Sequence, residues 1–302
     1  MKDIYKKQVS LLLEILPEIA KEDVFALHGG TAINLFCLNM PRLSVDIDLT
    51  YIPASENRNT DLQNIRSALE RVKERLRKRI PNISFADQVR AEEELKLIST
   101  TPEAMVKIEV NQINRGIISD TELMILCDKA QETFDKFCEV RMVSRKQLWG
   151  GKINAALDRQ HPRDLFDIRN LINEVGYSTD IKEGFIFFLL CGKRPIHESL
   201  NPHSIDQSAV FESQFQGMTD NTFGNDEYQE TREQLIKMIN ESLTTEDKGF
   251  LLAFSKGDPD WTKVDYSKYP AIRWKLINIK KLKESNPQKY GEQVEMLRQI
   301  LF

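Results

Sequence analysis

The sequence predicts an α+β fold, with a mixed sheet in the N-terminal part and mainly helices in the C-terminal part. Three observations predict it. Short strand-like runs gather before residue 113, a strongly periodic amphipathic helix covers 61–80, and the pattern after about residue 121 is almost entirely helical. We therefore expect an N-terminal domain over residues 1–120 and a mainly helical C-terminal domain over residues 121–302.

The first elements alternate between helix and strand. Apolar residues at helical spacing predict a helix over 4–20, and the apolar run 24–28 predicts a buried strand that ends at a Gly-Gly turn. A short helix over 31–38 should follow. Residues 45–52 then alternate apolar and polar side chains with a period of two, which predicts a second strand.

The next elements complete the expected sheet. Apolar residues three and four apart predict the helix at 61–80. Three strand-like stretches follow at 83–90, 94–100 and 105–113. Together with the strand at 45–52 they would make a mixed or largely antiparallel sheet.

After about residue 121 we expect helices separated by loops near 192–206, 217–227 and 255–271. The Gly-Lys-Arg-Pro stretch at 192–195 is the best local signal for a domain boundary, because glycine and proline interrupt regular elements.

The composition is that of a soluble globular protein. The chain has 302 residues, of which 41% are hydrophobic and 29% charged, and 42 basic against 46 acidic residues give a net charge of −4. These values exclude a disordered or fibrous chain, and they restrict any nucleic-acid binding to a local basic patch. The four cysteines have no paired spacing, and the sequence shows no signal-peptide pattern and no apolar run of membrane length. We expect a cytoplasmic protein with no membrane partner.

Two carboxylates mark the predicted strand at 45–52. Residues i and i+2 of a strand point to the same face, so Asp46 and Asp48 should project side by side while Ile47 points into the core. Two close carboxylates favour a divalent cation between them, and hard oxygen ligands select Mg²⁺ or Mn²⁺. The alternative is a solvated strand face without a function.

A glycine turn precedes these carboxylates. Gly29 and Gly30 let the backbone approach a ligand closely, and the helix that follows offers free N–H groups and the positive end of its dipole, to which the Thr31 hydroxyl adds a donor. A Gly-Gly turn by itself is nearly uninformative. A turn for phosphates followed by an acidic strand for metal is what is needed to place a nucleoside triphosphate for attack at its α-phosphorus.

A third carboxylate is expected for a two-metal site, and Glu109 is the best candidate. Val106, Ile108 and Val110 alternate with polar residues, so Glu109 lies on the polar face of a predicted strand. A surface pair of Lys107 and Glu109 explains the same pattern equally well.

The order Gly29-Gly30-Thr31 and then Asp46-Ile47-Asp48 resembles the signature of the DNA polymerase β-type nucleotidyltransferase superfamily. More narrowly it is similar to the AbiEii/AbiGii group, the toxin half of abortive-infection toxin–antitoxin pairs, to which the MenT toxins belong. The resemblance runs from residue 24 to about residue 280.

The resemblance implies a nucleotidyltransferase fold and an enzyme that moves a nucleotide from a nucleoside triphosphate to an RNA acceptor, the 3′ end of tRNA, with release of pyrophosphate. It implies Mg²⁺ or Mn²⁺ held by Asp46 and Asp48, with Glu109 as a third ligand. Gly29, Gly30 and Thr31 would hold the triphosphate. A separately encoded antitoxin is also implied, without a requirement for direct contact.

A second cluster lies downstream, where Lys152 begins a predicted helix and Pro162 begins another that carries Asp164 and Asp167. A lysine beside a metal site neutralises triphosphate charge, and a nearby aspartate orients it or accepts a proton. The resemblance implies that Lys152 is the catalytic lysine and Asp167 the aspartate, with Asp164 as the competitor, and that both complete an active cleft with the N-terminal domain. The alternative is structural: Asp164 favours the helix start, and Arg159 or Arg163 pairs with Asp167.

Two basic patches are by default solvated helix faces, and the alternative is that they contact the phosphates of an RNA. The first is on the helix at 61–80 and the second is near the C-terminus. We expect Trp261 and Trp274 in the core rather than as stacking platforms. The first patch comprises Arg71, Lys73, Arg75, Arg77, Lys78 and Arg79, and the second comprises Lys275, Lys280, Lys281 and Lys283.

Two other functions are compatible with the sequence. The first is the same chemistry with a small-molecule or protein acceptor, and the second is a regulatory module that binds a nucleotide without turnover.

Overall fold

The structure is a computed structural model that describes residues 1–55, 57–87 and 95–302. Within these residues the chain forms two compact units. Unit 1 comprises Met1–Leu148 together with Gln214–Thr222, and unit 2 comprises Trp149–Ser213 together with Phe223–Phe302.

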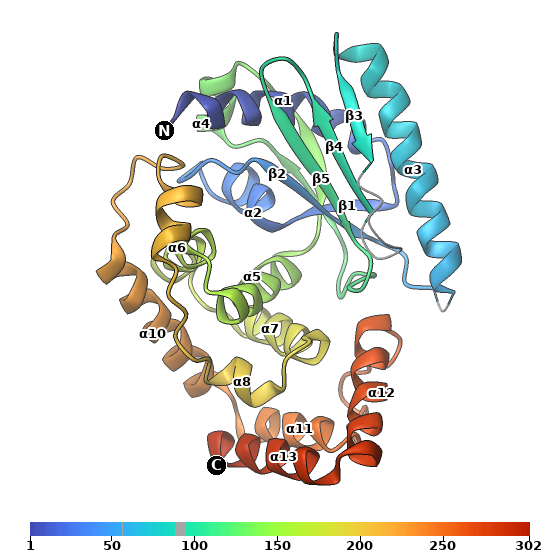
Figure 1. The fold of residues 1–302 in the computed structure, drawn as a ribbon, viewed down its shortest axis with the longest axis vertical. Coiled ribbons are helices and arrows are strands. Elements are labelled where there is room, and N and C mark those ends of the chain that lie inside the picture. The colour runs from blue at the N-terminus through green and yellow to red at the C-terminus, as the bar shows by residue number, and fades with distance from the viewer. Residues whose placement is uncertain (56, 88–94) are drawn as a thin grey trace. The chain divides into compact units, whose positions relative to one another are not determined.

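Unit 1 is built on a mixed sheet (Figure 1). Over the described residues seven strands pair in the order β3-β4-β5-β2-β1-β7-β6. β2 pairs antiparallel with β1 and parallel with β5, and β1 is parallel to β7. The other neighbouring strands are antiparallel. The strands are β1 (Phe25–His28), β2 (Asp46–Tyr51), β3 (Ser84–Asp87), β4 (Leu95–Thr100), β5 (Met105–Asn111), β6 (Glu122–Ile125) and β7 (Glu139–Met142).

The helices of unit 1 begin with α1 (Asp3–Ile19), which buries an apolar stripe. α2 (Gly29–Ala32) follows β1 directly and continues into the π-helical segment η1 (Ile33–Cys37). The longest helix is α3 (Arg58–Arg79). Its first turn is capped by Asn57, whose side chain accepts hydrogen bonds from the backbone N–H groups of residues 59 and 60. α4 (Asp128–Phe134) connects β6 to β7.

Unit 2 is helical, and its first helix, α5, begins just before the unit boundary. A Cβ at Gly150 of α5 would overlap the backbone of Gly184 in α7, so the two helices pack at backbone distance there. The segments are α5 (Arg145–Arg159), α6 (Pro162–Asn170), η2 (Leu171–Val175), α7 (Thr179–Cys191), α8 (Ile196–Leu200), α9 (Ser208–Val210), η3 (Phe211–Phe215), α10 (Asn225–Ser242), α11 (Thr245–Ser255), α12 (Pro270–Ser285) and α13 (Pro287–Leu301).

The α+β fold class is confirmed, and so are the N-terminal helices and strands expected from the sequence, with small shifts at their ends. The expected strand over 83–90 is present as β3, and its last three residues lie outside the described part of the chain, as does residue 94. The short helix expected over 31–38 begins two residues earlier, at Gly29, and ends as a π-helical segment.

The expectation of an almost entirely helical pattern from residue 121 is wrong for β6 and β7. Both strands are only four residues long, too short to show a clear period of two, and β6 lies at the edge of the sheet with alternate residues exposed. Because these strands belong to unit 1, that unit extends to Leu148 and not to the expected residue 120.

The two faces of the sheet differ in chemistry. Ile47 and Leu49 of β2 point to one face and are 0% and 2% exposed. α1 packs on this apolar face, where its residues Leu16 and Ile19 line one small cavity together with Leu49. The opposite face carries the charged residues of β2 and β5 and is described below.

No helix in the described part of the chain is both long enough and apolar enough to cross a membrane.

Candidate functional site

The glycine turn lies directly beside one of the predicted carboxylates. β1 ends at His28, which pairs with Asp48 of β2, and the chain then turns at Gly29 with φ of +71°. A Cβ at Gly29 would overlap the carboxylate of Asp48, so only glycine fits here. A Cβ at Gly30 would lie 2.8 Å from Nη2 of Arg42. The structure therefore brings the predicted turn and one predicted carboxylate together.

The Thr31 side chain holds the turn against β2. Thr31 is 1% exposed, and its hydroxyl lies 2.5 Å from the main-chain oxygen of Asp46 and 3.0 Å from Oγ of Ser44. The Asn34 side chain also donates to the main-chain oxygen of Gly30, at 2.9 Å. The hydroxyl is thus engaged within the protein, and the predicted contribution of Thr31 to nucleotide binding rests on its backbone.

Asp46 and Asp48 lie on the polar face of β2, as the strand period predicted, and both are partly exposed. In the parallel pairing of β2 with β5, Asp46 is opposite Lys107 and Asp48 is opposite Glu109. Residues opposite each other in a sheet share a face, so three carboxylates and one ammonium group form a square on this face. The predicted third carboxylate therefore lies on the strand next to the other two.

Lys107 lies on the same face of the sheet as these three carboxylates. Its Nζ lies 3.0 Å from Oε2 of Glu109. Partial burial acts to lower the pKa of Lys107, but the negative charges of Asp46, Glu109 and Asp48 outweigh it and raise that pKa. Lys96 of β4 adds a second cation, 3.8 Å from Oε1 of Glu109.

The three carboxylates of this square are the candidate metal ligands. Among residues 1–55, 57–87 and 95–302, no three histidine, cysteine or carboxylate side chains are gathered closely enough to hold a metal ion as they stand. The donors still fit Mg²⁺ or Mn²⁺, because they are carboxylate oxygens that share one face of the sheet. Mg²⁺ binds through one or two carboxylates with water and phosphate oxygens as further ligands, which Asp46 and Asp48 satisfy.

The second predicted cluster is a buried ion network within unit 2. Nζ of Lys152 lies 2.8 Å from Oδ1 of Asp164 and 2.9 Å from Oδ2 of Asp167. All three side chains are buried, and Arg159 adds a contact at 2.6 Å from Nε to Oδ2 of Asp164. Burial acts to raise the pKa of Asp164, but the charges of Lys152 and Arg159 hold it well below its usual range.

The sequence left open whether Asp164 or Asp167 acts together with Lys152. Both aspartates contact Lys152, so either one can orient it. Arg159 contacts Asp164, and the alternative pairing of Arg159 or Arg163 with Asp167 stays a prediction. Pro162 does begin α6, and the ring of His161 accepts a hydrogen bond from the N–H of Arg163 at the start of that helix.

Arg42 was missed by the sequence reasoning. It is 2% exposed, donates from Nη1 to the main-chain oxygen of Leu43 at 2.9 Å, and places its guanidinium beside Gly30. A fixed positive charge beside a phosphate-binding turn would favour an anionic ligand. An isolated arginine in a loop gives no periodic signal, and its only warning in the sequence is its position four residues before Asp46.

The first basic patch, on α3, is largely compensated by acids. Arg71 and Arg75 contact Glu22 at 2.5 and 2.8 Å, and Arg79 contacts Glu18 at 2.8 Å. Glu18 lies in the last turn of α1, Glu22 follows that helix, and both are buried. Burial acts to raise the pKa of each glutamate, but the arginine contacts lower it. The structure therefore favours the structural interpretation of this patch over an RNA footprint.

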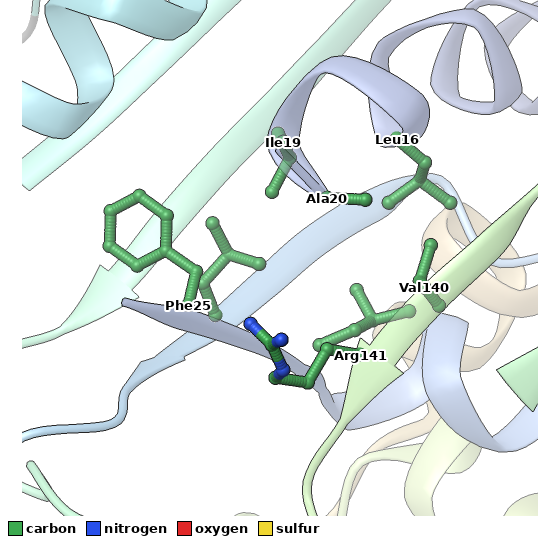
Figure 2. Close-up of a pocket in the computed structure, with 8 residues that line it drawn as sticks. Leu16, Ile19, Ala20, Phe25, Val140 and Arg141 are labelled. Carbon is green, nitrogen blue, oxygen red and sulfur yellow. The ribbon is translucent and has the colours of Figure 1, made fainter. Parts of the chain in front are cut away.

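A small pocket of unit 1 lies on the apolar face of the sheet, and Figure 2 shows its lining. Its lining comes from α1, β1, β2 and β7 and is apolar apart from Arg141. Its volume of about 10 Å³ is enough for one water molecule at most, so it offers no room for a nucleotide.

Comparisons with known proteins complete the description of the site. The family model described as the nucleotidyl transferase AbiEii toxin of type IV toxin–antitoxin systems matches residues 10–278. Among solved structures the chain is similar to MenT4, a nucleotidyltransferase toxin from Mycobacterium tuberculosis, with a TM-score of 0.62 and 12% identity over 92% of this chain and 95% of that chain. At that identity the likeness shows the fold alone. No curated protein sequence matches the chain.

Proposed function

The chain belongs to the AbiEii nucleotidyltransferase toxin family, whose model covers most of its length, and from this premise we propose its substrates and site. It transfers a nucleoside monophosphate from a nucleoside triphosphate to an RNA acceptor, the 3′ end of tRNA, with release of pyrophosphate. Membership confirms the resemblance predicted from the Gly-Gly-Thr and Asp-Ile-Asp motifs. Members of the family are nucleotidyltransferases, so the chain is an enzyme.

One observation supports this proposal above the others, namely that the Asp48 carboxylate lies against Gly29. A backbone turn that accepts phosphates and a carboxylate that accepts a cation are thereby neighbours on one sheet face. A nucleoside triphosphate carries its cation on its phosphate oxygens, so it needs both groups within a few ångströms of each other.

Asp46 and Asp48 would hold Mg²⁺ or Mn²⁺, with Glu109 as a third ligand. When bound, the cation would withdraw charge from the phosphate oxygens and lower the barrier to attack at phosphorus. The backbone N–H groups after Gly29 and Gly30 would bind the triphosphate, and the charge of Arg42 would favour it. The hydroxyl of the acceptor forms the new bond to the α-phosphorus as the bond to the pyrophosphate oxygen breaks.

Lys152 is proposed as a further ligand of the triphosphate. Because Asp167 is fully buried and 2.9 Å from Nζ of Lys152, we assign it to orienting this lysine and not to proton abstraction. Asp164 is the competing residue for the same task. Lys152→Arg keeps the charge but not the geometry, so a catalytic lysine predicts a loss of turnover in this variant that exceeds its loss of stability.

The description of the family as part of type IV systems implies an antitoxin. We propose that it is separately encoded and acts without direct contact with this chain. We also place the protein in the cytoplasm, where nucleoside triphosphates and tRNA are available, with no membrane partner.

The test is to incubate the purified protein with Mg²⁺, total RNA and each labelled nucleoside triphosphate in turn. We expect label in tRNA with one or more nucleotides, pyrophosphate release, and no transfer or growth inhibition by Asp46→Asn or Asp48→Asn. Full toxicity of Asp48→Asn would refute the proposal. Label on protein or on a small molecule would show that the acceptor is that molecule and not RNA. A nucleotide that binds without being consumed would indicate a regulatory module.

A further inference from the structure

The helix α12 carries an unusual concentration of positive charge for an acidic protein. No acidic residue occurs from Tyr266 to Lys283, a stretch that spans most of the helix and the turn before it. Asp265 and Glu284 flank this stretch, so its six basic residues exceed the acids in the local sequence. The basic residues of this stretch are Lys268, Arg273, Lys275, Lys280, Lys281 and Lys283.

An aromatic side chain stands out among these charges. Trp274 is 60% exposed, and Ile277, one turn further on, is 47% exposed. Trp274, Ile277 and Lys281 are spaced by three and four residues, so they share one helix face. Nζ of Lys281 lies 5.9 Å from the centre of the Trp274 ring. The expectation that Trp274 belongs to the core is therefore wrong.

The opposite side of α12 fixes the helix in unit 2. Ala271 and Ile272 are 3% and 0% exposed. Lys275 is largely buried, and its ammonium group donates to the main-chain oxygens of Gly192, at 2.6 Å, and of Arg194. A helix anchored in this way presents its outward face as a rigid surface.

The cations of this face differ from those of α3. On α3 the arginines are paired with the buried Glu18 and Glu22, at and just after the end of α1. Within the described part of the chain, Lys280, Lys281 and Lys283 make no ion pair with a carboxylate, and Lys280 and Lys281 are exposed. Their charge is available to a ligand.

We propose that the outward face of α12 binds a single-stranded stretch of the RNA acceptor, with Trp274 as a platform for a base and Lys280 and Lys281 as contacts to phosphates. Exposed aromatic rings beside lysines are what single-stranded nucleic acid requires, because every base has a face to stack and every nucleotide a phosphate. A second copy of the chain fits less well, since the lysines of one α12 face would meet those of the other, and the one acid on this face, Glu284, lies at the end of the helix. The inference rests on the proposed RNA acceptor.

The test measures binding without catalysis. A fluorescent single-stranded oligoribonucleotide is titrated with the full-length protein in the absence of nucleoside triphosphate and metal, and the anisotropy is recorded at several salt concentrations. We expect Trp274→Ala to weaken binding about 10-fold and Trp274→Phe to restore most of it. The double variant Lys280→Gln/Lys281→Gln should lower the slope of log affinity against log salt by about 1.4, since each phosphate contact on a single strand contributes about 0.7.

A matched control removes the same charge elsewhere in unit 2. Lys237 and Lys263 each pair with a glutamate, so Lys237→Gln/Lys263→Gln should leave the slope unchanged. Unchanged affinity in Trp274→Ala overturns the inference, and so does a change in sedimentation of Trp274→Ala without a change in RNA affinity, which would assign the face to protein contact.

A transfer assay on the same proteins separates the two proposals. Wild-type protein that binds RNA through α12 but never transfers a nucleotide to RNA leaves this inference intact and refutes the proposed function. If the wild type transfers a nucleotide to RNA, and the α12 variants bind and transfer as well as the wild type, the proposed function stands and the inference about α12 is refuted.

Discussion

At the scale of single residues, Gly29 carries two constraints at once. Its φ of +71° is open to glycine at little cost, and a side chain would displace the Asp48 carboxylate. We expect Gly29→Ala to destabilise the protein by about 1 kcal/mol through the backbone alone and to lower transfer activity by at least about 100-fold through the displaced carboxylate. Urea denaturation and the labelled-nucleotide assay measure the two effects.

Gly257 supplies the matched control for that variant. Its φ is +80°, and a Cβ there would make only an ordinary contact of 3.5 Å with Ile279. Gly257→Ala should therefore show a similar loss of stability with full activity. Equal activity losses in the two variants would mean that the carboxylate contact has no catalytic meaning.

Lys107 provides a second prediction at this scale. Its ammonium group competes with any cation for Asp46, Asp48 and Glu109, and removing it leaves their repulsion unrelieved. We expect Lys107→Met to bind Mn²⁺ about 10-fold more tightly than the wild type, which corresponds to about 1.4 kcal/mol. Calorimetric titration with Mn²⁺ alone tests this without reference to activity.

The control for Lys107 is Lys7→Met, because Lys7 pairs with Glu103 at 3.6 Å and is half exposed. Its Mn²⁺ affinity should equal that of the wild type. If Lys107→Met binds Mn²⁺ no better than Lys7→Met, the charged square on β2 and β5 is a structural ion pair and not a cation site.

At the scale of elements, α1 and α3 are joined by a ladder of ion pairs. Arg75 contacts both Glu18 and Glu22, whose side chains are only 4% and 6% exposed. Loss of this arginine removes one cation from each buried carboxylate, while Arg71 and Arg79 keep their contacts with them. Arg75→Gln should therefore lower the free energy of unfolding by about 1–3 kcal/mol. Lys78→Gln, an exposed position on the same helix, should cost less than about 0.5 kcal/mol. Weakened RNA binding by folded Arg75→Gln would instead support the RNA footprint.

The ion network between α5 and α6 predicts a pH dependence. The pKa of Asp164 is lower in the folded protein than its unfolded value of about 3.9, so its stabilisation is complete above that value and is lost as the pH falls toward the folded pKa. At pH 7 we expect Asp164→Asn to lose about 3–5 kcal/mol, because Lys152 and Arg159 lose a buried partner. The difference from the wild type should shrink below pH 4 in urea titrations. A difference that stays constant from pH 7 to pH 3 would contradict the assignment.

The elements that the sequence predicted well are those with long periodic signals. The 61–80 helix and the 45–52 strand repeat their apolar residues often enough to predict both the kind of element and the side that is buried. For the strand, this predicted Asp46 and Asp48 on one face. β6 and β7 were not predicted because a strand of four residues alternates only twice between the two faces of a sheet. In addition, Leu123 and Ile125 of β6 are exposed. The burial of Arg42 and the compensation of the arginines on α3 depend on residues distant in sequence, which no local pattern reports.

At the scale of the whole molecule, unit 1 is discontinuous in sequence. The segment Gln214–Thr222 belongs to unit 1, although helices α5 to α9 precede it in the sequence. The main-chain oxygen of Met218 accepts from the N–H of Leu43 at 2.7 Å, and that of Gly217 accepts from the N–H of Lys2 at 2.8 Å. Leu43 lies three residues before Asp46, so a distant part of the chain fixes the entry to the acidic strand.

This discontinuity gives the last prediction. A fragment of residues 1–148 contains every strand of the sheet, but it lacks the segment that bonds to Leu43 and Lys2 and buries Met218 and Phe215. We expect this fragment to show reduced near-ultraviolet dichroism and to lose Mn²⁺ binding, because the loop before Asp46 is no longer fixed. Coexpression with residues 149–302 should restore both, since the missing segment returns in the second chain. A fragment 1–148 that binds Mn²⁺ as tightly as the full chain would show that the sheet alone orders the carboxylates.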